Sequence, residues 1–242
     1  MRLLYSSLLF LFSISLLSAS ERILIVVTNH SDLGETGAPT GYFLSEVAHP
    51  WHVFTEAGYS VDFASPQGGY APMDPKSFDL EDPINKAFWH SLEAVESVVS
   101  TQSLETIDAS AYEAIFFAGG HGTMWDFPNS DTIATRISDI YSAGGVVGAV
   151  CHGPAALVGV VVDGKPLVQG KRVAAFTNSE ESAVQLTDAM PFLLETKLRE
   201  LGAEVILADN FQTNVEVDGR LVTGQNPASA TKAAEAIVDL LD

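Results

Sequence analysis

The fold is decided by the stretch Gly148-Ala149-Val150-Cys151-His152-Gly153-Pro154, which joins an apolar run to a helical pattern. The apolar run, 145–150, predicts a buried strand, and residues 154–158 predict the first turns of a helix. A strand-to-helix turn of small residues with one nucleophile at its tip is typical of a nucleophile elbow. Such a turn lifts the side chain off the sheet, and the helix N-terminus would stabilise a thiolate. We therefore expect Cys151 to be a nucleophile.

Cys151 is the only cysteine in the 242 residues, so it cannot form an intramolecular disulfide. A buried structural cysteine is the alternative, because free cysteine is among the most buried residue types. The nearby glycines, Gly148 and Gly153, favour the catalytic interpretation, since a cysteine that only packs in a core does not need them. His152 follows directly and would act as a base, as an orienting partner, or only through its backbone N–H.

Residues 1–20 have the pattern of a secretory signal peptide. Arg2 precedes an apolar run, 3–17, and small residues at 18–20 resemble a cleavage site. An uncleaved anchor is the alternative. We therefore expect an exported protein, periplasmic or secreted, without stable membrane association after cleavage. The remaining residues, 21–242, are predicted to form a single domain, because no linker of Pro, Gly and Ser divides them.

The chain is strongly acidic. Its 12 basic and 31 acidic residues give a formal net charge of −19. Such a field repels nucleic acid and anionic membrane surfaces. We therefore expect no nucleic-acid partner and a small-molecule ligand that is neutral or cationic.

Strand patterns alternate with helix patterns along the chain. Strands are expected at 23–27, 59–64, 112–118, 145–150 and 203–207, with hairpins over 161–175 and 215–222. Helices are expected at 42–57, 131–143, 192–201 and 228–241, and a long loop at 65–83 leads into helical residues up to about 100. This alternation predicts an α/β fold with a mostly parallel central sheet and helices on both faces.

Three of the loops that follow predicted strands carry chemical groups. They are the loop 29–40, the loop Gly119-Gly120-His121-Gly122 and the turn at Cys151. In open α/β sheets, ligands bind beyond the carboxyl ends of the strands, so these loops are expected to meet at one edge. The backbone N–H groups of Gly120 and His152 would form a pair of oxyanion donors. A simple glycine turn is the alternative.

Three acidic residues could serve this site. Glu46 lies on the flank of the apolar stripe of the predicted helix 42–57, and the pattern alone favours a surface charge. Glu180 and Glu181 follow a short predicted strand, and either could orient His152 as the carboxylate of a triad does. The alternative for the pair is a helix N-terminus that favours acids.

The positions of the six histidines exclude two classes of enzyme. All of them lie at or before position 152, whereas papain-like proteases and glutaminase triads need a histidine well after the cysteine. Glu46 and His49 have a spacing seen in metal sites, but a single such pair is weak evidence. We expect neither a metal nor another cofactor.

The elbow and the glycine loop together resemble the ThiJ/PfpI superfamily, whose fold is that of class I glutamine amidotransferases. Three further segments resemble its glyoxalase III branch, which includes chaperone-type heat-shock proteins. They begin at Thr40-Gly41-Tyr42-Phe43, at Val61-Asp62-Phe63-Ala64 and at Gly219-Arg220-Leu221-Val222. The resemblance runs from about residue 22 to the C-terminus.

This resemblance implies a flavodoxin-like three-layer sandwich, usually a homodimer, with no cofactor. It implies that Glu46 faces the sulfur of Cys151, and that Cys151, His152 and Glu181 form a triad beside Gly120 and His121. The family is mostly cytoplasmic, so the predicted signal peptide departs from it.

The implied activity is a glutathione-independent glyoxalase, of the D-lactate dehydratase type, acting on methylglyoxal or a similar 2-oxoaldehyde through a hemithioacetal. A cysteine amidase, peptidase or deglycase using the same thiolate is the alternative enzyme. A redox sensor or holdase chaperone is the alternative without catalysis.

Overall fold

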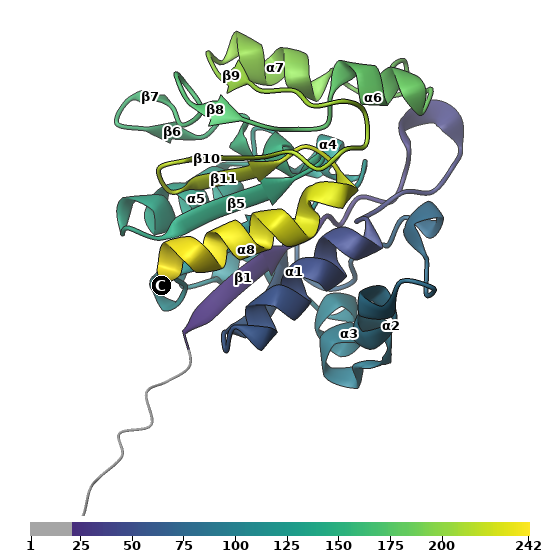
Figure 1. Cartoon of the computed structure of the whole chain (residues 1–242), viewed down its shortest axis with the longest axis vertical. Helices are drawn as coiled ribbons and strands as arrows, with labels where there is room; N and C mark the ends of the chain where they lie inside the picture. The colour runs from purple at the N-terminus through teal and green to yellow at the C-terminus, as the bar shows by residue number, and fades with distance from the viewer. Residues whose placement is uncertain (1–20) are drawn as a thin grey trace, which may run out of the picture.

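The computed structural model describes residues 21–242, and its centre is a seven-stranded sheet (Figure 1). The strand order is β10-β11-β5-β4-β1-β2-β3. Every neighbouring pair is parallel except β10 and β11, which form an antiparallel hairpin. The strands are β1 Arg22–Val26, β2 Ser60–Ser65, β3 Gln102–Ser103, β4 Ala114–Phe117, β5 Val146–Val150, β10 Val215–Asp218 and β11 Leu221–Gly224.

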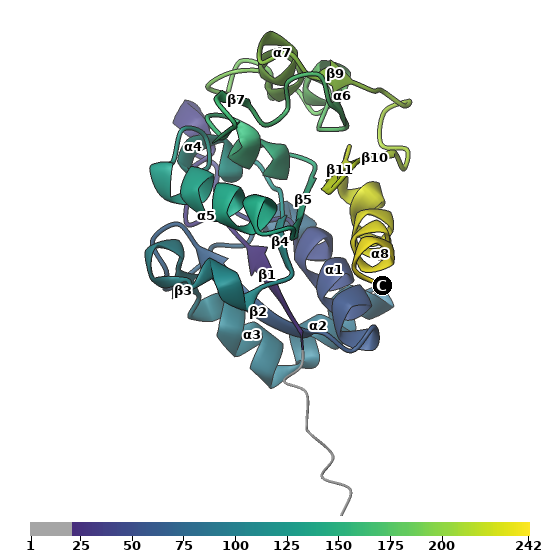
Figure 2. The same ribbon diagram turned by 90° about the vertical axis from the view of Figure 1, so that its left-hand side faces the viewer.

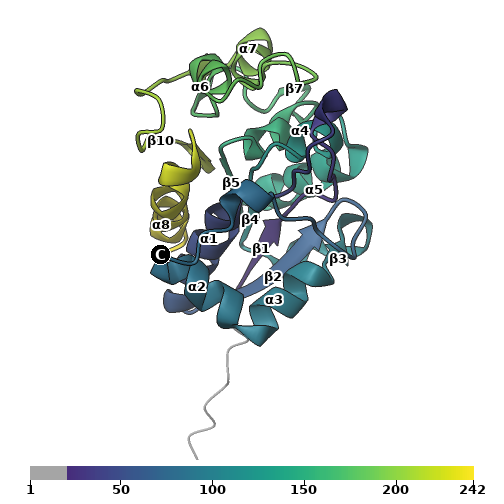
Figure 3. The ribbon, with the colours of Figure 1, turned by 90° about the vertical axis from the view of Figure 1, so that its right-hand side faces the viewer.

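Helices cover both faces of this sheet, which makes three layers. Figures 2 and 3 show α1 (Leu44–Glu56) and α8 (Ala230–Leu241) on one face and α5 (Asp131–Ser142) on the other. The sequence of β1 explains this, because successive side chains of a strand point to opposite faces. Ile23 and Ile25 belong to the apolar cluster of α1 and α8, whereas Leu24 belongs to the cluster of α5. The predicted flavodoxin-like α/β sandwich is confirmed.

The remaining elements are short. The other helices are α2 Pro83–His90, α3 Leu92–Val99, α4 Thr123–Asp126, α6 Asn178–Ala183 and α7 Leu194–Glu200. Turns of 3₁₀ helix lie at η1 Gly34–Thr36, η2 Pro75–Ser77, η3 Leu104–Thr106, η4 Ala109–Ala111, η5 Gly153–Leu157 and η6 Pro227–Ser229. None of the helices within residues 21–242 is both long enough and apolar enough to cross a membrane.

The hairpin predicted over 161–175 is wrong for most of its length. Only β6 (Val161–Val162) and β7 (Lys165–Pro166) pair as a hairpin. Pro166 has no N–H to extend a ladder, and Gly170, with a φ of 74°, turns the chain away. The following strand, β8 (Arg172–Val173), instead pairs in parallel with β9 (Glu204–Val205) in a separate small sheet.

The register of the central strands brings the three predicted loops together. Phe117 of β4 lies beside Val26 of β1 on one side and beside Ala149 of β5 on the other. The loops after β1, β4 and β5 therefore begin side by side at the carboxyl edge of the sheet. The expected meeting of the chemical groups at one edge is confirmed.

Gly148, in the middle of β5, lets α8 approach the sheet closely. A Cβ at this position would lie 2.4 Å from Cδ1 of Ile237 and 2.8 Å from Cδ2 of Phe116. We expect Gly148→Ala to lower the free energy of unfolding by about 1–3 kcal/mol through overpacking. Chemical denaturation of the wild type and the variant would measure this loss.

A double-mutant cycle tests the cause of this loss. Ile237→Val removes the methyl group nearest to the added Cβ and alone costs about 0.5–1.5 kcal/mol. If Ile237 is the obstacle, the double variant will lose less than the sum of the two single losses. Strictly additive losses would contradict this account of the packing.

Candidate functional site

The turn after β5 is a strained elbow with Cys151 at its tip. The φ of Cys151 is 60°, a left-handed conformation that is uncommon for residues other than glycine and that clusters at functional sites. Gly153 makes the turn possible, because a Cβ there would lie 2.2 Å from the carbonyl oxygen of Phe117. Cys151 is only 3% exposed. The predicted elbow is present, but its cysteine is buried.

The segment after the elbow differs from the predicted helix. It is the five-residue 3₁₀ helix η5, which is too short to give a substantial dipole. Burial raises the pKa of the Cys151 thiol well above its ordinary value, and negative charge on Glu46 would raise it further. Backbone N–H groups of Gly120 and His152 act in the opposite direction. Burial therefore opposes a thiolate in the free site, and the stabilisation of a thiolate by this segment stays a prediction.

Glu46 lies in the first turn of α1 and is fully buried against Cys151. Its Oε2 accepts a hydrogen bond of 2.8 Å from the N–H of Gly119. Burial raises the pKa of Glu46 to about 8, although the contacts with Cys151 and Gly119 lower it. At neutral pH this carboxyl group therefore keeps its proton, and its O–H can donate to the sulfur.

The surface position that the helical pattern favoured for Glu46 is wrong. The glycine loop after β4 creates space for the side chain, because a Cβ on Gly119 would lie 2.6 Å from Oε2 of Glu46. A residue with a side chain at Gly119 would therefore exclude the acid. This contact joins α1 to β4 and cannot be read from the periodicity of α1 alone.

Two histidines share one carboxylate beside the cysteine. Nε2 of His152 lies 2.8 Å from Oε2 of Glu181, and Nε2 of His121 lies 3.0 Å from Oε1. Burial would raise the pKa of Glu181, but hydrogen bonds from both imidazoles outweigh burial and bring the pKa to about 2. Burial, aided by His121, lowers the pKa of His152 to about 4 despite the opposing effect of Glu181. At neutral pH, His152 is neutral and Glu181 is ionised.

These protonation states fix the tautomer of His152. An ionised carboxylate can only accept hydrogen bonds, so Nε2 of His152 carries the hydrogen that faces Glu181. Nδ1 then has a free lone pair, and it lies 3.4 Å from Sγ of Cys151. The side chain of His152 can therefore accept the thiol proton. The sharp turn at Cys151 is what brings these adjacent side chains together.

The two adjacent acids have different partners. Glu181 contacts His152, as the resemblance implies, whereas Glu180 caps the start of α6. Oε2 of Glu180 accepts hydrogen bonds of 3.0 Å from both the N–H and the hydroxyl of Thr177. The capping interpretation therefore applies to Glu180.

The glycine loop after β4 fits closely against the N-terminal side of α1. Gly120 has a φ of 100°, and a Cβ there would lie 2.2 Å from the carbonyl oxygen of Gly41. Only glycine fits this position. Its N–H and that of His152 both interact with the sulfur of Cys151, and their role as oxyanion donors stays a prediction.

Glu46 and His49 do not share a site. The ring of His49 is engaged elsewhere, with Nδ1 2.9 Å from the hydroxyl of Thr231 and Nε2 3.2 Å from Asp82. Ligand atoms of His121, His152 and Glu181 lie within 4.8 Å of one another, a spacing compatible with a metal ion. Their mutual hydrogen bonds already explain this spacing. Catalysis without a metal stays a prediction.

Sequence reasoning missed the aromatic side chains beside the histidines. The ring of Phe176 lies 4.4 Å from that of His152, and Phe211 lies 6.4 Å from Phe176. Phe176 follows the short apolar run 173–175, and no spacing distinguishes it from an ordinary core residue. Its position depends on the hydrogen bond from its N–H to the carbonyl oxygen of Cys151.

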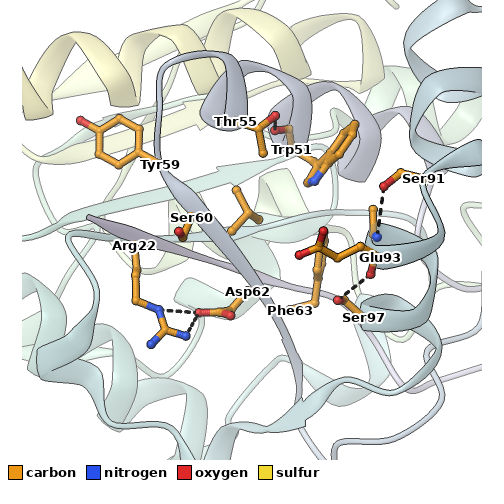
Figure 4. A pocket seen from close by; sticks show the side chains of 12 residues that line it. Arg22, Trp51, Thr55, Tyr59, Ser60, Asp62, Phe63, Ser91, Glu93 and Ser97 are labelled. Atoms are coloured by element: carbon orange, nitrogen blue, oxygen red, sulfur yellow. Dashed lines mark hydrogen bonds and ion pairs between the residues drawn. The ribbon is translucent and has the colours of Figure 1, made fainter. Parts of the chain in front are cut away.

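A cavity of about 570 Å³ lies away from these residues, between α1, β2 and α3 (Figure 4). Its polar groups pair with one another, as the contacts of Arg22 with Asp62 and of Ser97 with Glu93 show. Trp51 and Phe63 supply apolar walls. No cysteine or histidine lines this cavity, so it does not compete with the elbow as the candidate active site.

Comparison with known proteins identifies similar chains from yeasts and bacteria. Glyoxalase 3 of Candida albicans is 31% identical over 90% of this chain and 97% of its own length. A glutathione-independent glyoxalase of Saccharomyces cerevisiae is 32% identical over 92% of this chain and 99% of its own. The crystal structure of glyoxalase III from Candida albicans superimposes with a TM-score of 0.84, covering 91% of this chain and 97% of that one at 31% identity. The Rapid Encystment Protein of Francisella tularensis gives a TM-score of 0.89 at 41% identity, covering 92% and 99% of the two chains.

The prediction of export is wrong. The curated relatives that match this chain over nearly their whole length are yeast glyoxalases, and none of their names indicates an exported protein. The prediction depended on residues 1–20, which lie outside the described residues.

The resemblance inferred from the elbow and the glycine loop is confirmed at the level of the family. The DJ-1/PfpI family matches residues 38–240, which include Glu46, the glycine loop, the elbow and Glu181. The chain therefore belongs to the DJ-1/PfpI family.

Proposed function

We propose that this protein is a glutathione-independent glyoxalase that converts methylglyoxal, or a similar 2-oxoaldehyde, into a 2-hydroxy acid. The relatives described above carry this activity in their names. The observation that supports it most is the pair of groups at the sulfur of Cys151. Nδ1 of His152 can take the thiol proton, and the carboxyl group of Glu46 can exchange a proton near neutral pH. The reaction needs both groups, because the thiol must lose its proton and a second proton must move from one carbonyl carbon to the next.

The first step is addition of the thiol to the aldehyde. Sγ of Cys151 forms a bond to the aldehyde carbon, C1, while Nδ1 of His152 takes the thiol proton. The N–H groups of Gly120 and His152 hold the developing negative charge on oxygen. The proton then passes from His152 to this oxygen and gives a neutral hemithioacetal. Glu181 keeps the imidazole in the reactive tautomer and stabilises the transient imidazolium.

The second step moves a proton from C1 to C2. The carboxyl group of Glu46 gives its proton to the oxygen on C2 and takes the hydrogen of C1 as a proton, which leaves a neutral enediol. It then gives this proton to C2 and takes the proton of the hydroxyl group on C1, so that C1 becomes a carbonyl carbon. A pKa of about 8 suits this exchange, because a general acid–base group works best when its pKa is near the operating pH.

The third step releases the product. Proton transfer to C2 converts the hemithioacetal into a thioester of the 2-hydroxy acid. Water activated by His152 attacks the thioester carbonyl, the carbon–sulfur bond breaks, and the thiol of Cys151 is restored. The sum is one 2-oxoaldehyde plus one water to one 2-hydroxy acid, which is lactate for methylglyoxal. No oxidant or reductant takes part.

Burial of the site favours small substrates. Cys151 is 3% exposed and His152 is fully buried, so an extended peptide or a folded protein has poor access to the sulfur. This disfavours the peptidase alternative and a deglycase acting on proteins. An amidase of small substrates, a redox sensor and a holdase stay as alternatives.

We also propose that residues 21–242 act as one domain, since a single family matches 38–240. Assembly as a homodimer stays a prediction from the resemblance.

Lactate formation from methylglyoxal in the absence of glutathione tests the proposed activity. We expect the wild type to turn over and Cys151→Ser to give no lactate above background. Glu46→Gln should lose a factor of about 10²–10⁴, because glutamine keeps the hydrogen bonds of the protonated acid but cannot carry a proton between carbons. Circular dichroism of each variant checks that the fold is intact.

Two results would overturn this proposal. Full turnover by Cys151→Ser would exclude the hemithioacetal. An inactive wild type would exclude the glyoxalase activity, and measurement of amide hydrolysis, of Cys151 sulfinate and of client protection would then separate the alternatives.

The role of Glu181 gives a second prediction. Glu181→Gln removes the charge that fixes the tautomer of His152, so we expect kcat to fall by about 100-fold or more. Glu195→Gln is the matched control, because Glu195 is another buried acid, and its partner is a backbone N–H, that of Asn178, and not a histidine ring. Equal activity of the two variants would contradict the orienting role of Glu181.

A further inference from the structure

The connection between β9 and β10 carries an exposed aromatic residue in a strained conformation. Phe211 is 45% exposed and has a φ of 62°. Aromatic residues seldom adopt this left-handed conformation, which persists where the surroundings impose it. Figure 1 shows this connection passing beside α6. The surroundings of Phe211 therefore hold this residue in a strained backbone conformation.

A buried carboxylate imposes the conformation. Oε1 of Glu180 accepts hydrogen bonds of 2.8 Å from the N–H of Phe211 and from Nδ2 of Asn226. Together with the two bonds from Thr177, these satisfy a side chain that is fully buried. Asn226 also donates to the carbonyl oxygen of Gln212, so the same pair holds the next residue of the loop.

This anchor places Phe211 next to the aromatic ring that contacts His152. The ring of Phe176 lies 4.4 Å from that of His152 and 6.4 Å from that of Phe211. Because Phe176 is itself bonded to the carbonyl oxygen of Cys151, the aromatic series leads from the elbow to the surface. Glu180 and Glu181 thus point from one helical turn to two parts of the same site.

We propose that Phe211 is a specificity-determining residue and that Glu180 is its positioning residue. The ring forms an apolar wall that limits the size of the group attached to the keto carbon of a 2-oxoaldehyde. Glu180 keeps the ring in place through the N–H of Phe211. This inference rests on the proposed function for the identity of the substrate, but the wall itself limits access to Cys151 for any reagent.

Phe211→Gly tests the wall without adding backbone strain, because glycine readily adopts a positive φ. Asp163→Gly is the matched control, since Asp163 has a φ of 52° in the β6–β7 turn, which lies on the opposite side from α6 in Figure 1. We expect the ratio of kcat/KM for phenylglyoxal to that for methylglyoxal to rise about tenfold or more in Phe211→Gly. The control should leave this ratio unchanged.

Alkylation of Cys151 gives a readout that does not depend on glyoxalase activity. Cys151 is the only thiol, so iodoacetamide and the bulkier iodoacetanilide report on one site. Phe211→Gly should raise the rate with iodoacetanilide more than the rate with iodoacetamide. If the wild type is inactive toward both oxoaldehydes and Phe211→Gly still changes the alkylation rates in this way, the wall is supported and the proposed substrate is overturned.

Glu180→Gln tests the positioning role. The NH₂ group of the glutamine side chain is a donor and would face the N–H of Phe211 or that of Thr177, which is also a donor. One of these hydrogen bonds would be lost, so the loop should be released. We expect the same change in both ratios as in Phe211→Gly, which a loss of stability alone would not produce. If Glu180→Gln does not fold, Phe211→Gly decides the proposal. Ratios within twofold of the wild type for folded Phe211→Gly would overturn it.

Discussion

A carboxyl group without access to water is costly to ionise, and here that group lies against the sulfur of the only cysteine. Glu46 is fully buried, and burial raises its pKa to about 8. The acid therefore enters the folded state with its proton, and burial favours the thiol form of the sulfur beside it. The rest of the site follows from this constraint, because reaction at the sulfur then needs a separate base. His152 supplies it through the nitrogen that Glu181 leaves free.

The sheet brings these groups together from distant parts of the sequence. Glu46 comes from α1, Gly120 from the loop after β4, the elbow from β5 and Glu181 from α6. Close backbone approach is what allows them to meet. Side chains at Gly119, Gly120 or Gly153 would collide with Glu46, with Gly41 and with β4, respectively. The glycines therefore serve the chemistry by leaving space for it.

The sequence predicts the layers and the elbow well, because both depend on local pattern. The alternation of apolar runs and helical stripes predicts the parallel sheet, and small residues around Cys151 predict the turn. It fails where an interaction joins remote segments. Periodicity assigns Glu46 to the surface, since nothing in α1 reveals the space above Gly119. The run 173–175 looks like the return of a hairpin, yet the strand there, β8, pairs with β9. The contact between Phe211 and Glu180 has no local signal, because it spans 31 residues.

The most direct test of the buried acid is the pH dependence of stability in the wild type and in Glu46→Gln. Between about pH 6.5 and about pH 7.5 the unfolded chain ionises Glu46 while the folded chain keeps its proton, so stability falls as pH rises. Glu181, whose ordinary pKa is 4.5, has completed its contribution below this window, and Cys151, at 9.0, begins above it. His152, at 6.5, still titrates in the unfolded chain at the lower edge of the window, but it does so equally in the wild type and in Glu46→Gln. The difference in free energy of unfolding between wild type and variant should shift by about 1.4 kcal/mol per pH unit against the wild type. Parallel pH profiles would contradict the account, because they would mean that Glu46 is already ionised beside the sulfur.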